Sequence, residues 1–155
     1  MAALTQNRNT SRMDDRRRVY PLAASVTVYL GSIVCLDANG NANPGSTATG
    51  LKCVGVALRA YTPLGPDIPG KPAINTGGAA GAELVEVERI TAGFDNSASD
   101  PVDVTCIGLN CFVVDDHTVS KTDGGGTQSV AGRVTGIDPT GQVLVDFEHQ
   151  SALAT

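Results

Sequence analysis

The fold is decided by residues 26–58, which read VTVYLGSIVCLDANGNANPGSTATGLKCVGVAL. Residues 26–30 and 33–36 are short β-prone runs, and the Gly-Ser pair between them is typical of a tight hairpin turn. Small polar residues and glycines follow, and then an apolar run over 51–58. We therefore predict a β-hairpin over 26–36, a further turn and loop, and a buried strand.

Strand-like patterns continue along the chain. Residues 83–90 (ELVEVERI) alternate strictly, which predicts a strand with Val85 and Val87 on one face and Glu86 and Glu88 on the other. We expect these acidic side chains to be solvated. Further strands are predicted over residues 102–107, 111–115, 132–137 and 142–147. The fold class is therefore all-β, a small β-barrel or β-tulip-like domain with little helix.

Residues 61–81 interrupt this pattern. They contain four prolines and five glycines, a composition that opposes both helix and central strand. We predict a long Pro/Gly-rich loop excursion from the core. Loops of this length are uncommon in compact domains unless they have a function or lie against a partner.

Positive charge is concentrated near the N-terminus. Residues 1–18 hold five of the eleven Lys and Arg residues and two acidic residues, whereas residues 19–155 hold six basic and fourteen acidic residues. We predict an extended basic N-terminal arm over 1–18, which attaches the protein to a partner, and a single β-domain over 19–155. The predicted docking residues are Arg8, Arg12, Arg16, Arg17, Arg18 and Tyr20.

An acidic protein surface is the expected partner of this arm. Arginines can also neutralise phosphates, but Asp14 and Asp15 dilute the positive charge, and the acidic domain would repel a polyanion. Nucleic acid is therefore not the expected partner. A solvated tail without a partner is the alternative.

The four cysteines, Cys35, Cys53, Cys106 and Cys111, mostly stand among apolar residues. We expect reduced, buried thiols that pack as small apolar side chains. Because their spacing is not that of a zinc site and both histidines are isolated, no metal site and no cofactor are predicted. A Cys-based hydrolase that pairs Cys106 or Cys111 with a histidine is a remote alternative, since an apolar context raises the pKa of a thiol.

The triplet Asp115-Asp116-His117 contains the residue types of a general base or a metal ligand set. Adjacent residues on a strand point to opposite faces, so only Asp115 and His117 could converge. The polar run that follows favours a turn between two strands. We therefore predict a solvated hairpin end here and no catalytic role.

Three stretches of the chain have distinctive sequences. They read NRNT (7–10), YPLAASVTVYLGSIVCLDANGNANPGSTATGLKCVGVA (20–57) and CFVVDDHTVSKTDGGGTQSVAGRVTGID (111–138). These stretches resemble the small capsid cement, or head decoration, proteins of tailed phages and prophages. The resemblance implies a β-barrel or β-tulip body outside the icosahedral shell, a small oligomer, and an N-terminal arm that reaches neighbouring major capsid protein subunits. It implies neither enzyme activity nor a cofactor.

The predicted function is that of a structural virion protein that binds the outer capsid surface, cements major capsid protein subunits and stabilises the expanded head. A homotrimer is favoured, with a dimer as the alternative. A tail, baseplate or head-fibre component with a self-assembling β-domain is the second hypothesis. The sequence has no apolar run of the roughly 18 residues that cross a bilayer and no signal-peptide pattern. We expect synthesis in the host bacterial cytoplasm, no membrane contact, and a final location in the virion.

Overall fold

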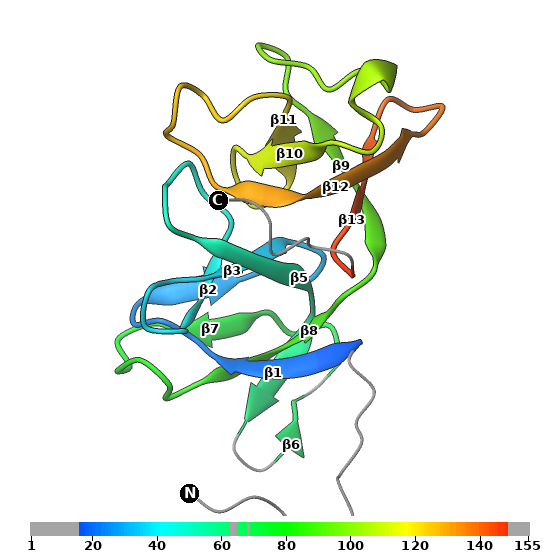
Figure 1. The fold of residues 1–155 in the computed structure, drawn as a ribbon. Coiled ribbons are helices and arrows are strands. Elements are labelled where there is room, and N and C mark those ends of the chain that lie inside the picture. The colour runs from blue at the N-terminus through cyan, green and yellow to red at the C-terminus, as the bar shows by residue number, and fades with distance from the viewer. Residues whose placement is uncertain (1–15, 63–64, 68, 149–155) are drawn as a thin grey trace, which may run out of the picture.

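The computed structural model describes residues 16–62, 65–67 and 69–148, which form three groups of strands (Figure 1). A six-stranded sheet has the order β1-β8-β5-β3-β4, with β6 paired to β5. A closed barrel contains β10-β11-β9-β13-β12, and a two-stranded sheet pairs β2 with β7. The prediction of an all-β fold with a small barrel is confirmed.

The large sheet consists of β1 (Arg17–Pro21), β3 (Ile33–Leu36), β4 (Ala42–Pro44), β5 (Lys52–Thr62), β6 (Gly65–Pro66) and β8 (Leu84–Glu88). The barrel consists of β9 (Thr91–Asn96), β10 (Asn110–Val113), β11 (Thr118–Ser120), β12 (Val130–Ile137) and β13 (Val143–Asp146). The small sheet consists of β2 (Val26–Val28) and β7 (Ala73–Asn75), and a short 3₁₀ turn, η1 (Val104–Cys106), precedes β10. Among the residues described, no helix is long and apolar enough to cross a membrane.

The large sheet is buried on both faces at β3. Ile33 and Cys35 join the barrel core, whereas Val34 between them joins a second core with Val28 of β2 and Ala73 of β7. Successive side chains of a strand point to opposite faces. A strand buried on both sides therefore needs a continuous apolar run such as IVCL.

The hairpin predicted over 26–36 is wrong. β2 pairs with β7 in the small sheet, whereas β3 pairs with β4 and β5 in the large sheet. The turn itself is present, because the Ser32 N–H donates to the carbonyl of Tyr29, but the chain passes through it from one sheet to the other. Both edges of β3 are occupied by β4 and β5, so no edge is left for β2.

The loop excursion predicted over 61–81 is only partly correct. β5 extends to Thr62, β6 pairs with the end of β5, and β7 supplies the strand partner of β2. The Asn75 side-chain amide donates to the carbonyls of Ala23 and Ala79, each at 2.9 Å, and so fixes the chain at the end of β7. Proline and glycine are thus concentrated around these short strands and not within them, apart from β6.

The strand predicted over 83–90 is confirmed as β8, with Val85 and Val87 fully buried. The strands predicted over 111–115, 132–137 and 142–147 correspond to β10, β12 and β13. The strand predicted over 102–107 is wrong. Asp103 instead caps η1 and accepts a hydrogen bond from the Thr105 N–H at 2.8 Å, which bends the chain at this point.

Candidate docking surface

The predicted arm runs into the edge strand β1. Strand β1 begins at Arg17, so the region predicted as an arm overlaps the large sheet by two residues. Just outside the two ends of β1, the carbonyl of Arg16 accepts from the Arg89 N–H at 2.7 Å, and the Leu22 N–H donates to the carbonyl of Glu83 at 2.8 Å. Strand β1, which includes the last two residues of the predicted arm, is therefore fixed to β8 by backbone hydrogen bonds.

Among the described residues, no strand pairs with the second edge of β1, which we call its open edge. Backbone hydrogen bonds of an antiparallel pair alternate along the strand, and those of the even-numbered residues point to β8. The N–H groups of Arg17 and Val19 consequently point away from β8. Strand β1 is the terminal strand of the sheet order among the residues described. An edge of this kind can pair with a strand of another chain.

Charged side chains alternate across the face that Arg17 shares with β8 and β5. Arg17 Nε lies 3.5 Å from Glu88 Oε1, and Arg59 Nε contacts Glu86 Oε2. The two carboxylates are largely covered, since the Glu86 and Glu88 side chains are 11% and 18% exposed. The arginine side chains are more exposed, at 54% for Arg17 and 33% for Arg59. We therefore find the acidic side chains of β8 paired, where the sequence predicted solvation.

The structure describes four of the six predicted docking residues. Arg8 and Arg12 lie outside the described residues. Arg16 Nε lies 4.0 Å from Glu148 Oε1, and Arg18 Nη1 donates to the carbonyl of Arg17 at 3.1 Å. Tyr20 packs against the second core. The arginines of β1 thus lie at the open edge, whereas Tyr20 is partly buried in the protein.

Arg59 belongs to this surface and was missed from the sequence. It lies about forty positions from Arg17 in the chain, and only the pairing of both strands with β8 brings them to one face. The available signal was its charge within the otherwise uncharged run 53–62. A cation in such a strand opposite the ELVEVERI pattern indicates a cross-strand ion pair.

A second exposed surface lies on the barrel. Val104, Ile107 and Leu109, around η1, are 70%, 51% and 61% exposed. Arg133 and Ile107 line a shallow cavity of about 360 Å³ beside them. Clustered apolar side chains on a surface commonly mark a protein contact.

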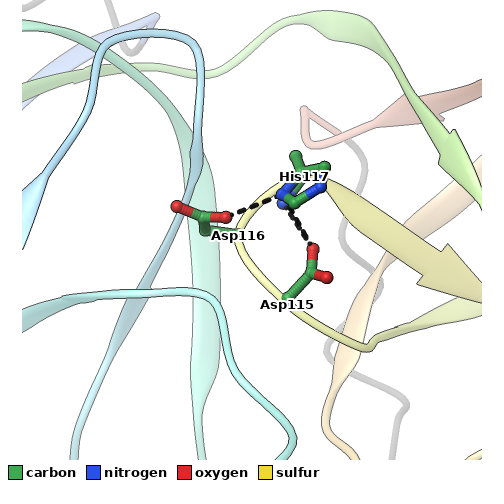
Figure 2. Close-up of side chains that lie close together, drawn as sticks. All are labelled: Asp115, Asp116 and His117. Atoms are coloured by element: carbon green, nitrogen blue, oxygen red, sulfur yellow. Dashed lines mark hydrogen bonds and ion pairs between the residues drawn. The ribbon is translucent and has the colours of Figure 1, made fainter.

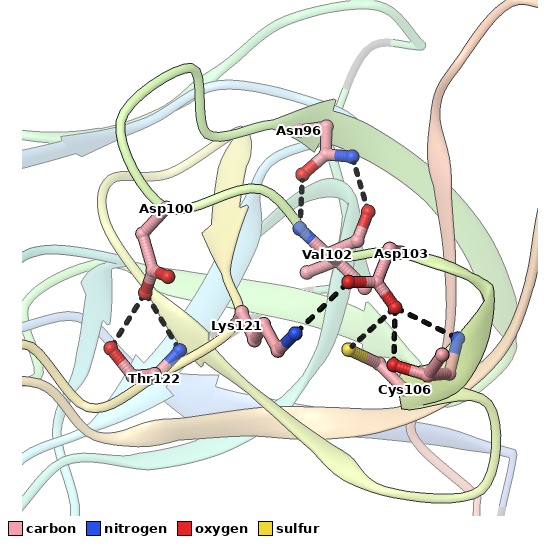
Figure 3. A network of polar contacts seen from close by, with 8 residues as sticks. Asn96, Asp100, Val102, Asp103, Cys106, Lys121 and Thr122 are labelled. Atoms are coloured by element: carbon pink, nitrogen blue, oxygen red, sulfur yellow. Dashed lines mark hydrogen bonds and ion pairs between the residues drawn. The ribbon is translucent and has the colours of Figure 1, made fainter.

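The loop that presents these side chains is held by polar contacts (Figure 3). The Asn96 side chain donates to the carbonyl of Val102 and accepts from its N–H, both at 2.8 Å. Lys121 Nζ lies 2.9 Å from Asp103 Oδ2. The hydroxyl of Thr105, together with Lys121, holds the pKa of Asp103 well below its usual value. Val104, Ile107 and Leu109 therefore lie on a loop whose conformation is held by these contacts.

Asp115, Asp116 and His117 form the turn between β10 and β11, as predicted (Figure 2). His117 Nδ1 lies 2.9 Å from Asp116 Oδ1 and 3.1 Å from Asp115 Oδ1. Both carboxylates converge on the imidazole because the triplet lies in a turn, where strand alternation does not apply. The hydrogen bond with Asp116 and the charge of Asp115 raise the pKa of His117.

The three side chains offer two carboxylates and an imidazole within 4.8 Å of one another, which are ligand types for several divalent metals. The same atoms are engaged in the ion pairs of the turn. The Ile33 N–H also donates to the carbonyl of Asp116 at 2.7 Å, which joins this turn to the large sheet. These contacts give the triplet a structural role.

The prediction of buried, unpaired cysteines is confirmed, because Cys35, Cys53, Cys106 and Cys111 are free and buried. Burial raises the pKa of the Cys111 thiol to about 12. A hydrogen bond with Cys35, together with burial, raises the pKa of Cys53 well above its usual value. These two thiols stay protonated at neutral pH, whereas a cysteine nucleophile reacts as the thiolate.

Comparison of the chain with protein-family models, with curated proteins and with solved structures finds no match.

Proposed function

We propose that the protein is a structural virion protein that binds the outer surface of a tailed-phage capsid and cements neighbouring major capsid protein subunits. The observation that supports this proposal best is the unpaired edge of β1 among the residues described, together with the three consecutive arginines at its start, Arg16, Arg17 and Arg18. A capsid strand that pairs with this edge gains backbone hydrogen bonds, and acidic side chains on it gain charge-assisted contacts with the arginines. No cofactor takes part.

Several weak contacts of this kind add up when copies are linked. An oligomer, for which we favour a trimer over a dimer, presents several arms at once, so each further contact forms at a high effective concentration. Binding only to the assembled lattice stabilises that lattice by mass action. The expanded head is then held against the pressure of the packaged DNA without any chemical reaction.

Co-sedimentation with undecorated, expanded phage heads tests the proposal. The full chain is compared, across a salt series, with a chain that starts at Arg16 and so keeps β1 intact. We expect saturable binding of the full chain that weakens as salt rises, and weaker binding of the shortened chain. If neither chain binds heads, the proposed function is wrong.

A single substitution tests the edge itself. The N–H of Val19 points away from β8, so Val19→Pro removes a donor from the open edge without breaking the β1–β8 ladder. Val19→Thr keeps both the N–H and the β-branched shape and is the matched control. We expect head binding to fall for Val19→Pro alone, while both variants keep the parent melting temperature. Equal binding by all three proteins would show that β1 does not accept a capsid strand.

The exposed loop around η1 favours a second candidate function, a self-assembling tail, baseplate or head-fibre component. Its apolar side chains Val104, Ile107 and Leu109 would be covered in a stack of copies. Light scattering and electron microscopy of the isolated protein distinguish the two functions. Rings or filaments that disappear in Leu109→Ser would favour the second candidate, and a small soluble species that binds heads would favour the first.

A further inference from the structure

We propose that the cavity between Arg17 and Arg59 binds a carboxylate side chain of a partner protein. The cavity has a volume of about 290 Å³ and is lined by Arg17, Leu58, Arg59, Pro69 and Gly70. The proposal rests on the proposed docking function for the identity of the partner, and it adds a defined anion site to the open edge of β1.

Both guanidinium groups have free donors. Arg17 and Arg59 each contact a glutamate through Nε, and the structure gives their terminal nitrogens no further contact among the residues described. A guanidinium has five N–H donors in a planar fork, and four of them belong to the terminal nitrogens. Each arginine can therefore hold its glutamate and still donate to a second oxyanion.

The glutamates fix the arginines without entering the cavity. Glu86 and Glu88 lie on β8, between the strands that carry Arg59 and Arg17, and neither lines the cavity. Among the described residues of the lining, the charged ones are the two arginines. Because both guanidinium groups are already held, an incoming anion finds donors that need little further ordering.

The walls of the cavity come from two irregular features. The register of β5 against β8 shifts between Ala57 and Arg59, which makes Leu58 an extra residue and brings it to the cavity wall beside Arg59. Pro69 and Gly70, in the segment predicted as a loop excursion, form another part of the lining, and Gly70 has a φ of 86°. This lining offers apolar contact for the methylene groups of an acidic side chain and donors for its carboxylate.

The cavity also fits the geometry of strand addition. Arg17 lies on the open edge strand, and a strand added there would run about 4.8 Å from β1. Every second side chain of the added strand would point to the face of the sheet that carries Arg17, Glu88 and Arg59. The carboxylate of a Glu or Asp at a matching position of the added strand could then accept hydrogen bonds from the arginines of this site.

The test uses the full-length protein alone, followed by nuclear magnetic resonance of the arginine Nε–H groups. Glutarate is the carboxylate probe, and inorganic phosphate at equal ionic strength is the competing anion. We expect saturable shifts of the Arg17 and Arg59 signals with glutarate, and affinity reduced about tenfold or more in Arg59→Gln, since each charge-assisted hydrogen bond contributes substantially. The matched control Arg133→Gln changes an exposed arginine on the barrel and should bind as the parent does.

Arg59→Gln leaves the covered Glu86 carboxylate unpaired and could destabilise the sheet. The double variant Arg59→Gln/Glu86→Gln removes both charges and should keep the fold while it still loses glutarate affinity. Linear, unsaturable shifts in the parent, or equal affinity in the double variant, would overturn the site. Tighter binding of phosphate than of glutarate would overturn its assignment to a carboxylate.

The outcome is separable from that of head binding. A parent protein that binds glutarate but not heads keeps the anion site and loses the capsid function. A parent that binds heads, in which Arg59→Gln/Glu86→Gln binds equally well, keeps the docking function and loses this site.

Discussion

Phe147→Ala should remove a large part of the stability of the barrel core. Phe147 follows β13, is fully buried, and meets Phe94 edge to face, with ring centroids 5.8 Å apart and ring planes at 87°. Truncation of a buried phenylalanine to alanine costs about 3–5 kcal/mol, because the transfer free energy is lost and a cavity remains. The contact with the Phe94 ring accounts for about 0.5–1.5 kcal/mol of such a loss.

Equilibrium unfolding in urea at neutral pH, with a reductant present, measures this loss. With a slope of about 2 kcal/mol per molar urea, a loss of about 4 kcal/mol lowers the midpoint by about 2 M. Tyr29→Ala is the matched control, since it deletes an exposed aromatic ring and should cost less than about 0.5 kcal/mol. A Phe147→Ala midpoint within about 0.5 M of the Tyr29→Ala midpoint would contradict the packing described here.

Three further predictions concern titratable groups. Because the folded pKa of Asp103 lies below its unfolded value of about 3.9, its contribution is present above that pH and is lost as the pH falls further. Acid should therefore accelerate amide exchange in the loop around η1, and less so in Asp103→Asn, where the charged contact with Lys121 is already absent. The raised pKa of His117 means that its contribution is complete below about pH 6.5 and is lost as the pH rises through the folded value. An imidazole titration by nuclear magnetic resonance should show this raised pKa, and Asp116→Asn should lower it; an unchanged value would exclude Asp116 as its cause. Finally, a thiol reagent should modify none of the four buried cysteines in the folded protein and all four in denaturant, and rapid modification of the folded protein would contradict their burial.

By itself, the sequence determined those structural features that depend only on residues close together in the chain. Alternation in ELVEVERI gives β8 because period two is a property of the strand itself. The apolar context of the cysteines indicated burial, and the polar triplet Asp115-Asp116-His117 indicated a turn. The all-β class follows from the sum of such short-range signals.

Tertiary structure alone decided the partners of β2 and β3. VTVYL and IVCL are separated by two residues, yet they belong to different sheets, because β3 is buried on both faces and its edges are taken by β4 and β5. The convergence of Arg17 and Arg59 likewise depends on the registers of β1 and β5 against β8, with a bulge at Leu58. Pairing between segments far apart in the chain is set by the burial of whole faces, and no local pattern encodes the partner of a strand edge.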